Sequence, residues 1–178
     1  MATKQQQLDF VKQLYPAALQ LYRERDGFHP HFVVAQAALE TGWKIRGINN
    51  NIFGITKGSW TGPVELCLTT EYFKTPGVQF RHPERIVNIE KINDTKYKYS
   101  VYRFFRVYES LSGCLEDHFA ILKKKGYEDA YPYRHDPEEY VRRIINDTGA
   151  KYATAENYDV TLISIIRIIE RHVKEIGL

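Results

Sequence analysis

The segment from residue 30 to residue 42 most constrains the fold, because it is apolar on nearly all sides at helical spacing. Its apolar members are Phe32, Val33, Val34, Ala35, Ala37, Ala38 and Leu39. A helix that is hydrophobic all round is normally buried in the core of a protein. Pro30 suits the first turn of such a helix, and Gly42 suits its end. The sequence therefore predicts a central buried helix.

Other elements are predicted on both sides of this segment. Apolar residues recur at helical spacing over about 5–25, 110–125, 137–147 and 157–176. Strict alternation over 64–72 predicts a strand, a second strand is expected around 97–106, and a short one around 86–91. Helices, one small sheet and more helices make an α+β fold.

Length and composition fit one folded domain over residues 1–178. Of the residues, 26% are charged and 43% are hydrophobic, which excludes a disordered, collagenous or disulfide-framework chain. Cys67 and Cys114 lack zinc-type spacing, and a single disulfide between them has no support. The first residues lack an apolar signal region, and no run of 18 apolar residues occurs. We expect no Sec-type signal in this chain and no membrane span.

Positive charge is concentrated in one segment. The net charge is only +3, too small to indicate nucleic acid, but residues 81–106 contain seven basic and three acidic residues. Such a segment could attract an anionic polymer, or it could be a solvated strand face. The 13 tyrosines similarly suit either a groove for polar, ring-shaped partners or packing at the rim of the core.

Glu40 is the most informative candidate for chemistry. It ends the apolar helical segment, and Gly42 and Trp43 follow it directly. Partial burial would disfavour the charged form of its carboxyl group, raise the pKa and suit a general acid. The alternative is a carboxylate on an exposed helix end.

Glu71 is the second candidate carboxylate. Hydrolysis of a glycosidic bond normally uses two carboxyl groups, one as acid and one as base or nucleophile. Glu71 lies on the 64–72 strand, on the face opposite Leu66 and Leu68, where Glu65 is a rival. Spacing alone cannot show that Glu40 and Glu71 face each other, and a solvent-exposed strand glutamate is the alternative.

Other chemistries have less support. The sequence contains no dinucleotide, P-loop, serine-hydrolase or zinc-protease motif, and its histidines show no ligand spacing beyond His29 and His31. We therefore expect neither a metal nor a cofactor.

Five motifs together resemble glycoside hydrolase family 73, the bacterial glucosaminidases. They are Ala-Gln-Ala-Ala-Leu-Glu-Thr-Gly-Trp at 35–43, Asn-Ile-Phe-Gly-Ile at 51–55, Trp-Thr-Gly-Pro-Val at 60–64, Thr-Thr-Glu-Tyr at 69–72 and Phe-Arg-Val-Tyr at 105–108. The resemblance continues at Tyr-Ala-Thr, 152–154, and Asn-Tyr, 157–158, and covers most of the chain from about residue 30 to 170.

This resemblance implies a lysozyme-like fold, in which a helical lobe and a small antiparallel β-lobe, here about 60–106, flank a substrate groove. It implies cleavage of the β-1,4 bond between N-acetylglucosamine and N-acetylmuramic acid in peptidoglycan. By motif position, Glu40 is the general acid, Glu71 is the second carboxylate and Tyr158 is an active-site tyrosine. The residues expected to bind substrate are Trp43, Asn51, Phe53, Trp60, Tyr72 and Tyr152. For Phe53, packing in the core is the favoured alternative.

The chain departs from the compact family pattern between Tyr72 and Phe105, where it is longer, and this insert is the basic segment. From the resemblance we expect a monomer that acts on peptidoglycan at the bacterial cell wall. The basic insert adds anionic wall polymers to the expected partners. A muramidase, a lytic transglycosylase and a non-catalytic wall-binding or phage structural module remain as alternatives.

Overall fold

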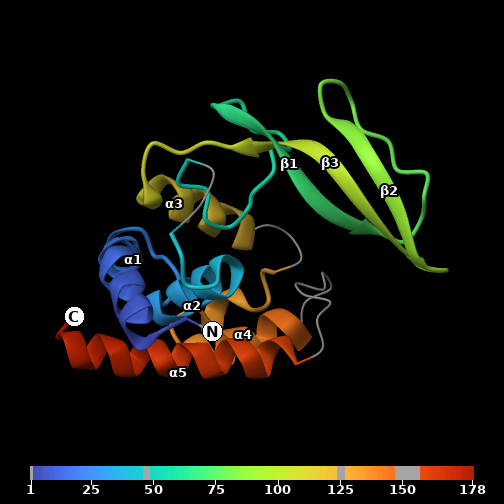
Figure 1. Cartoon of the computed structure of the whole chain (residues 1–178). Helices are drawn as coiled ribbons and strands as arrows, with labels where there is room; N and C mark the ends of the chain where they lie inside the picture. Colours follow the sequence, from blue (N-terminus) through green and yellow to red (C-terminus); the bar gives the residue numbers. More distant parts are fainter. Residues whose placement is uncertain (1, 46–48, 124–126, 147–156) are drawn as a thin grey trace. The chain divides into compact units, whose positions relative to one another are not determined.

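The computed structural model describes residues 2–45, 49–123, 127–146 and 157–178, and it confirms the predicted α+β class. These residues form two compact units (Figure 1). The helical unit comprises Met1–Phe53 and Tyr108–Leu178, and the sheet unit comprises Gly54–Val107. The organisation of residues 1–178 as one domain stays a prediction.

The buried helix of the sequence prediction is α2 (Pro30–Thr41). Nδ1 of its N-cap residue His29 accepts a hydrogen bond from the backbone N–H of His31. The helix ends at Gly42, whose φ of 61° is a left-handed conformation that glycine adopts without strain. Residues 32–38 are all buried, because α2 contacts α1 (Lys4–Glu24), α4 (Pro137–Asn146) and α5 (Tyr158–Ile176).

The remaining helices begin where the sequence supplies capping groups. A capping box between Thr3 and Gln6 starts α1, and the Ser110 hydroxyl accepts from a backbone N–H to start α3 (Leu111–Leu122). Before α4, the Asp136 carboxylate accepts from two backbone N–H groups, as its predicted N-cap role requires. A short 3-10 helix, η1 (Tyr131–Tyr133), precedes α4.

Aromatic rings pack tightly around Phe28 in the helical unit. Phe28 is fully buried and lies with its ring centroid 5.1 Å from those of Phe119 and Tyr140. Phe32 and Tyr131 contact the same ring at 6.2 and 5.7 Å. Two of the tyrosines thus serve packing, one of the alternatives that the composition left open.

The sheet unit contains one three-stranded antiparallel sheet in the order β1-β3-β2. Its strands are β1 (Val64–Phe73), β2 (Arg85–Asn93) and β3 (Lys96–Arg106). The short strand expected around 86–91 is therefore a full strand of nine residues. In the register, Glu71 lies opposite Tyr99, and Leu68 lies opposite Tyr102.

The two faces of this sheet differ strongly in exposure. Successive side chains of a strand point to opposite faces. The Tyr99 face carries Glu71, Phe73, Tyr99, Val101 and Arg103, and the Tyr102 face carries Leu66, Leu68, Thr70, Tyr72, Lys98, Ser100, Tyr102 and Phe104.

Residues 74–84 cover the Tyr99 face. The Phe80 ring contacts Phe73 at 6.1 Å, and the Thr75 carbonyl accepts a hydrogen bond from the Tyr99 hydroxyl. Tyr99 is consequently fully buried, whereas Tyr72 on the other face is 55% exposed.

Within the described ranges, no helix is both long enough and apolar enough to cross a membrane.

Replacement of Phe28 by Ala should lower the free energy of unfolding by about 3–5 kcal/mol, because it leaves a cavity among four aromatic neighbours. Urea denaturation followed by circular dichroism measures this loss. The control is Val160→Ala, at a side chain that is 64% exposed, which should change stability by about 0.5 kcal/mol or less. Equal effects of the two substitutions would contradict the packing role of Phe28.

Candidate active site

Glu40 lies in the last turn of α2, where the helix passes from the buried residues 32–38 through the half-buried Leu39 to solvent. The residue as a whole is exposed to solvent, yet surrounding protein atoms partly desolvate its carboxyl group and raise the pKa above the usual 4.5. A raised pKa keeps more of the carboxyl group protonated near neutral pH. A carboxyl group in this position is open to solvent and is of the type that can act as a general acid.

Tyr158 lies close to Glu40 because α2 and α5 pack together. Tyr158 is the first residue of α5 and is half-buried. Burial raises the pKa of its hydroxyl group to about 12, a hydrogen bond with the Gln36 side chain lowers it, and the negative charge of Glu40 raises it. The structure therefore brings together two of the predicted catalytic residues, Glu40 and Tyr158.

Gln36 completes this group and was not identified from the sequence. It lies four residues before Glu40, so both side chains occupy one side of α2. Its side chain is only 1% exposed and acts on the Tyr158 hydroxyl group, whose pKa it lowers. A polar residue one turn before Glu40 in an otherwise apolar helix is the signal that could have pointed to it.

The chain enters α5 through Asn157, the N-cap residue, which has a φ of 60°. Asparagine adopts this left-handed conformation more readily than most residues. The turn sets Tyr158 at the start of the helix. Tyr152, which the sequence placed among the substrate-binding residues, lies outside the described residues.

Glu71 lies on the Tyr99 face of the sheet unit and is held by Arg103. Nη1 of Arg103 donates to a Glu71 carboxylate oxygen at 2.6 Å, and Nε of the same side chain donates to Glu84 at 3.1 Å. Glu84 also accepts from the backbone N–H of Phe104 at 2.8 Å. All three side chains are half-buried, so the guanidinium group fixes the position of the Glu71 carboxylate between strand and covering loop.

Sequence reasoning did not identify Arg103 and Glu84, because their contacts with Glu71 depend on the fold. Arg103 lies opposite Cys67 on the face of the sheet that carries Glu71, and Glu84 belongs to the loop that covers this face. The rival carboxylate, Glu65, occupies the same face of β1 but is exposed.

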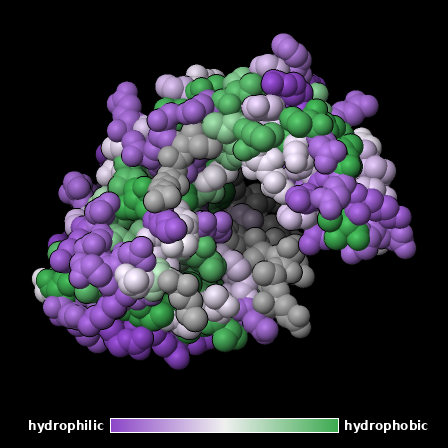
Figure 2. Space-filling view, viewed as in Figure 1, coloured by the Kyte–Doolittle hydropathy of each residue, from purple (hydrophilic) through white to green (hydrophobic). Residues whose placement is uncertain are grey.

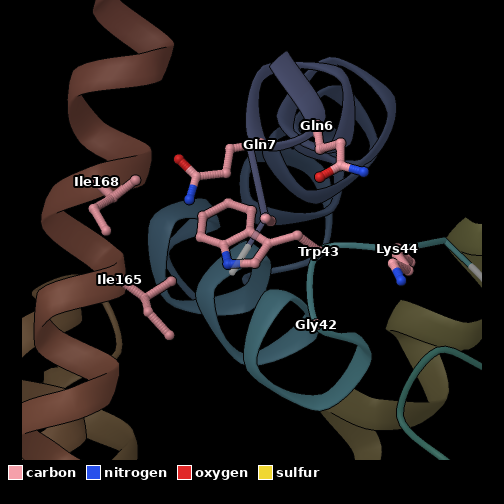
Figure 3. A pocket seen from close by; sticks show the side chains of 8 residues that line it. Gln6, Gln7, Gly42, Trp43, Lys44, Ile165 and Ile168 are labelled. Atoms are coloured by element: carbon pink, nitrogen blue, oxygen red, sulfur yellow. The ribbon is translucent and has the colours of Figure 1, made fainter. Parts of the chain in front are cut away.

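Trp43 follows the end of α2 and lines a pocket of the helical unit. The pocket has a volume of about 650 Å³ and is lined by Ala2, Gln6, Gln7, Gly42, Trp43, Lys44, Ile165 and Ile168. Figure 3 shows the indole ring between Gln7 of α1 and the isoleucines of α5. Trp43 also packs edge-on against Phe10 at 5.8 Å. Its ring therefore joins three helices and leaves one part open to the pocket.

Asn51 and Phe53 belong to the same unit. The Phe53 ring stacks on His118 at 3.8 Å between centroids, with an angle of 11° between the rings. Burial lowers the pKa of His118 to about 3, so the imidazole is neutral and acts as a flat packing partner. Asn51 is buried at 4% exposure, and Phe53 is half-buried. One face of the Phe53 ring therefore packs against another side chain, which agrees with the packing role that was the alternative to substrate binding.

Trp60 and Tyr72 belong to the sheet unit. The Trp60 indole N–H donates to the Pro63 carbonyl at 3.0 Å, and the Arg106 guanidinium lies 5.3 Å from the centroid of the indole ring. Tyr72 lies on the Tyr102 face, with Lys96 above its ring at 4.6 Å. Glu71 and Tyr72 therefore point to opposite faces of the sheet, and no single face of it presents both.

The described residues contain no cluster of three or more His, Cys, Asp or Glu side chains that could hold a metal ion. Cys67 and Cys114 are both free thiols. The polar groups named around Glu40 and Glu71 are carboxyl, amide, phenol and guanidinium groups.

Comparison with known proteins places these residues in a family. The family model described as mannosyl-glycoprotein endo-beta-N-acetylglucosaminidase matches residues 16–171. Two similar proteins are named peptidoglycan hydrolase FlgJ. The one from Salmonella typhimurium is 32% identical over 89% of this chain and 45% of its own length. The one from Pseudomonas aeruginosa is 30% identical over 92% of this chain and 37% of its own length. A probable N-acetylmuramidase of Lactococcus lactis is 27% identical over 80% of this chain and 29% of the relative.

The chain thus spans less than half the length of these relatives. No solved structure matches it significantly. The family match covers most of the residues and both candidate carboxylates, and the helical unit with a small antiparallel sheet agrees with the lysozyme-like α+β fold that the resemblance implied. The chain belongs to the glucosaminidase family of glycoside hydrolases, glycoside hydrolase family 73.

Proposed function

We propose that the chain hydrolyses peptidoglycan at the β-1,4 bond between N-acetylglucosamine and N-acetylmuramic acid, and that N-acetylglucosamine becomes the new reducing end. The observation that carries the proposal is the desolvated Glu40 carboxyl group beside Gln36 and Tyr158, at the position of the family's general acid. The family match and the relatives named peptidoglycan hydrolase support the substrate. On this proposal the protein works at the bacterial cell wall.

Glu40 donates its proton to the glycosidic oxygen as the bond to the anomeric carbon breaks. The raised pKa favours the protonated form that this step needs. Once the proton has left, the carboxylate is negative. Tyr158, with a pKa of about 12, stays protonated throughout the physiological range and therefore acts as a hydrogen-bond donor and not as a base.

Glu71 is the second carboxylate of the proposal. It removes a proton from the attacking water, or stabilises the positive charge that develops on the sugar ring. The Arg103 guanidinium, itself held by Glu84, fixes the carboxylate in place before substrate arrives. Arg103 and Glu84 thus act as positioning residues. Water supplies the hydroxyl group at the anomeric carbon and returns a proton, so the products are two free sugar ends.

The relative named probable N-acetylmuramidase supports a second candidate, cleavage of the other β-1,4 bond of the same polymer. That reaction would use the same carboxyl groups and leave muramic acid at the reducing end. Analysis of the products separates the two candidates.

Purified peptidoglycan treated with the protein should gain reducing ends that are N-acetylglucosamine, identified by borohydride reduction and mass spectrometry. Glu40→Gln should reduce the rate at least about 100-fold, because a general acid contributes about 10²–10⁴-fold. The matched control is Glu24→Gln, which changes the exposed last residue of α1 and should keep near-normal activity. Reducing ends of muramic acid would favour the muramidase, and anhydro ends without reducing ends would indicate a transglycosylase. Near-normal activity of Glu40→Gln would refute the role of Glu40.

The raised pKa of Glu40 also predicts the pH dependence of stability. Ionisation of Glu40 is less favourable in the folded state than in the unfolded state, so the ionised carboxylate destabilises the fold as the pH rises above about 4.5. Glu40→Gln should therefore raise Tm at about pH 7, and the difference should shrink at about pH 3.5, where both states are protonated. Scanning calorimetry at the two pH values measures it. If Glu40→Gln raised Tm by the same amount at both pH values, desolvation of the Glu40 charge would not be the cause of the gain.

Glu71→Gln should lower kcat at least about tenfold, and Glu65→Gln should leave it within about twofold. Both substitutions remove one carboxylate from the same face of β1, but only Glu71 is held by Arg103. Steady-state hydrolysis of soluble glycan chains measures both rates. Loss of activity in Glu65→Gln alone would transfer the catalytic role to Glu65.

A further inference from the structure

We propose that the Tyr102 face of the sheet binds an anionic, phosphodiester-linked polymer of the cell wall. This inference adds a binding surface to the proposed function and depends on it only for the cellular location of the polymer. The surface comprises the exposed Tyr102 face and three cations that lie over its aromatic rings: Lys57, Arg85 and Lys96.

Each of the three cations lies over a ring of this one face. The Arg85 guanidinium carbon is 4.1 Å from the centroid of Tyr102, Lys96 Nζ is 4.6 Å from Tyr72, and Lys57 Nζ is 5.6 Å from Phe104. Cation–π attraction orders these long side chains before any ligand binds. The ordered cations lose less conformational entropy on binding an anion than mobile side chains would.

Acidic side chains of the sheet unit do not neutralise these cations. Among the described residues, Lys57, Arg85 and Lys96 pair with no carboxylate. Glu90 lies on the Tyr102 face, but Lys98 pairs with it at 3.2 Å. Other carboxylates of the unit also have cationic partners: Glu71 and Glu84 pair with Arg103, and Asp94 pairs with Lys91. The Tyr102 face therefore keeps a positive surplus.

The cations form a row that suits a linear polymer. At one end Lys57 lies over Phe104 of β3. At the other end Lys96 lies over Tyr72, which is opposite Lys98 of β3. Six residues of strand correspond to about 20 Å. An arginine can donate two hydrogen bonds to one phosphate, and lysines act as point charges beside it. Repeated phosphates on one chain could thus contact all three cations together.

Exposed apolar side chains lie beside the cations, and they bear on whether the bound polymer is a nucleic acid or a polymer without bases. Leu68, in the same row as Tyr102 and Arg85, is 56% exposed, and Tyr72 is 55% exposed. Figure 2 shows hydrophobic and hydrophilic residues interleaved on the visible surface of the sheet unit. Proteins that bind single-stranded nucleic acid stack bases on open aromatic faces. Here a cation lies over one face of each ring and competes with a base for that face, which favours a polymer of phosphates and aliphatic or sugar carbons without bases.

The test is sedimentation of the protein with Gram-positive cell walls before and after removal of their phosphodiester polymers with hydrofluoric acid. Soluble poly(glycerol phosphate) serves as competitor. The triple variant Lys57→Gln, Arg85→Gln, Lys96→Gln should bind untreated walls at least about tenfold more weakly than the unaltered chain. The charge-matched control, Lys12→Gln, Arg25→Gln, Arg171→Gln, removes three exposed cations of the helical unit and should bind normally.

Binding of the unaltered chain should fall steeply between about 50 mM and about 200 mM salt, since a polyanion releases counterions when it binds. Hydrolysis of polymer-free peptidoglycan should be the same in the triple variant and the unaltered chain, which separates this surface from the catalytic proposal. Equal binding to untreated and stripped walls, or equal binding by the triple variant, would overturn the inference. Stronger competition by single-stranded DNA than by poly(glycerol phosphate) would overturn it in favour of nucleic acid.

Discussion

The burial of α2 on all sides is the constraint on which the helical unit depends. Residues 32–38 expose almost nothing to solvent, because α1, α4 and α5 pack against this helix. The same burial gives the helix end its chemistry. Gln36 is placed inside and Glu40 at the boundary with solvent, where the carboxyl group is partly desolvated and its pKa rises. The packing of the helical unit and the raised pKa of the Glu40 carboxyl group are thus two results of one apolar helix.

The sheet unit needs a covering segment to form a core, since three strands alone bury little surface. Residues 74–84 fold over the Tyr99 face and supply Phe80 to the small core. The covering loop also supplies Glu84, which holds Arg103, which in turn holds Glu71. The longer segment between Tyr72 and Phe105 therefore does more than carry positive charge. It gives the Glu71 carboxylate a fixed setting and leaves the opposite face of the sheet open.

Much of the fold and part of the candidate site could be predicted from the sequence. The buried helix, the alternating strand and the helix caps are local patterns. The place of Glu40 at the end of the apolar stretch made it a candidate, and the family resemblance implied its role as general acid. The length of β2 was underestimated, because exposed residues such as Val87 and Ile92 dilute the alternation of this strand. Gln36, Arg103 and Glu84 were missed, because each acquires its role from a partner distant in the chain.

The sequence by itself determined most of the secondary structure, the family and the positions of the two candidate carboxylates, since periodicity, capping residues and motifs are all local properties of the chain. Only the tertiary structure decided which face of the sheet is covered, because alternation defines two faces without saying which one a loop will bury. It also decided that Tyr158 lies beside Glu40 and that Arg103 lies beside Glu71. Helix packing and strand register set these contacts, and both join residues that the sequence keeps far apart.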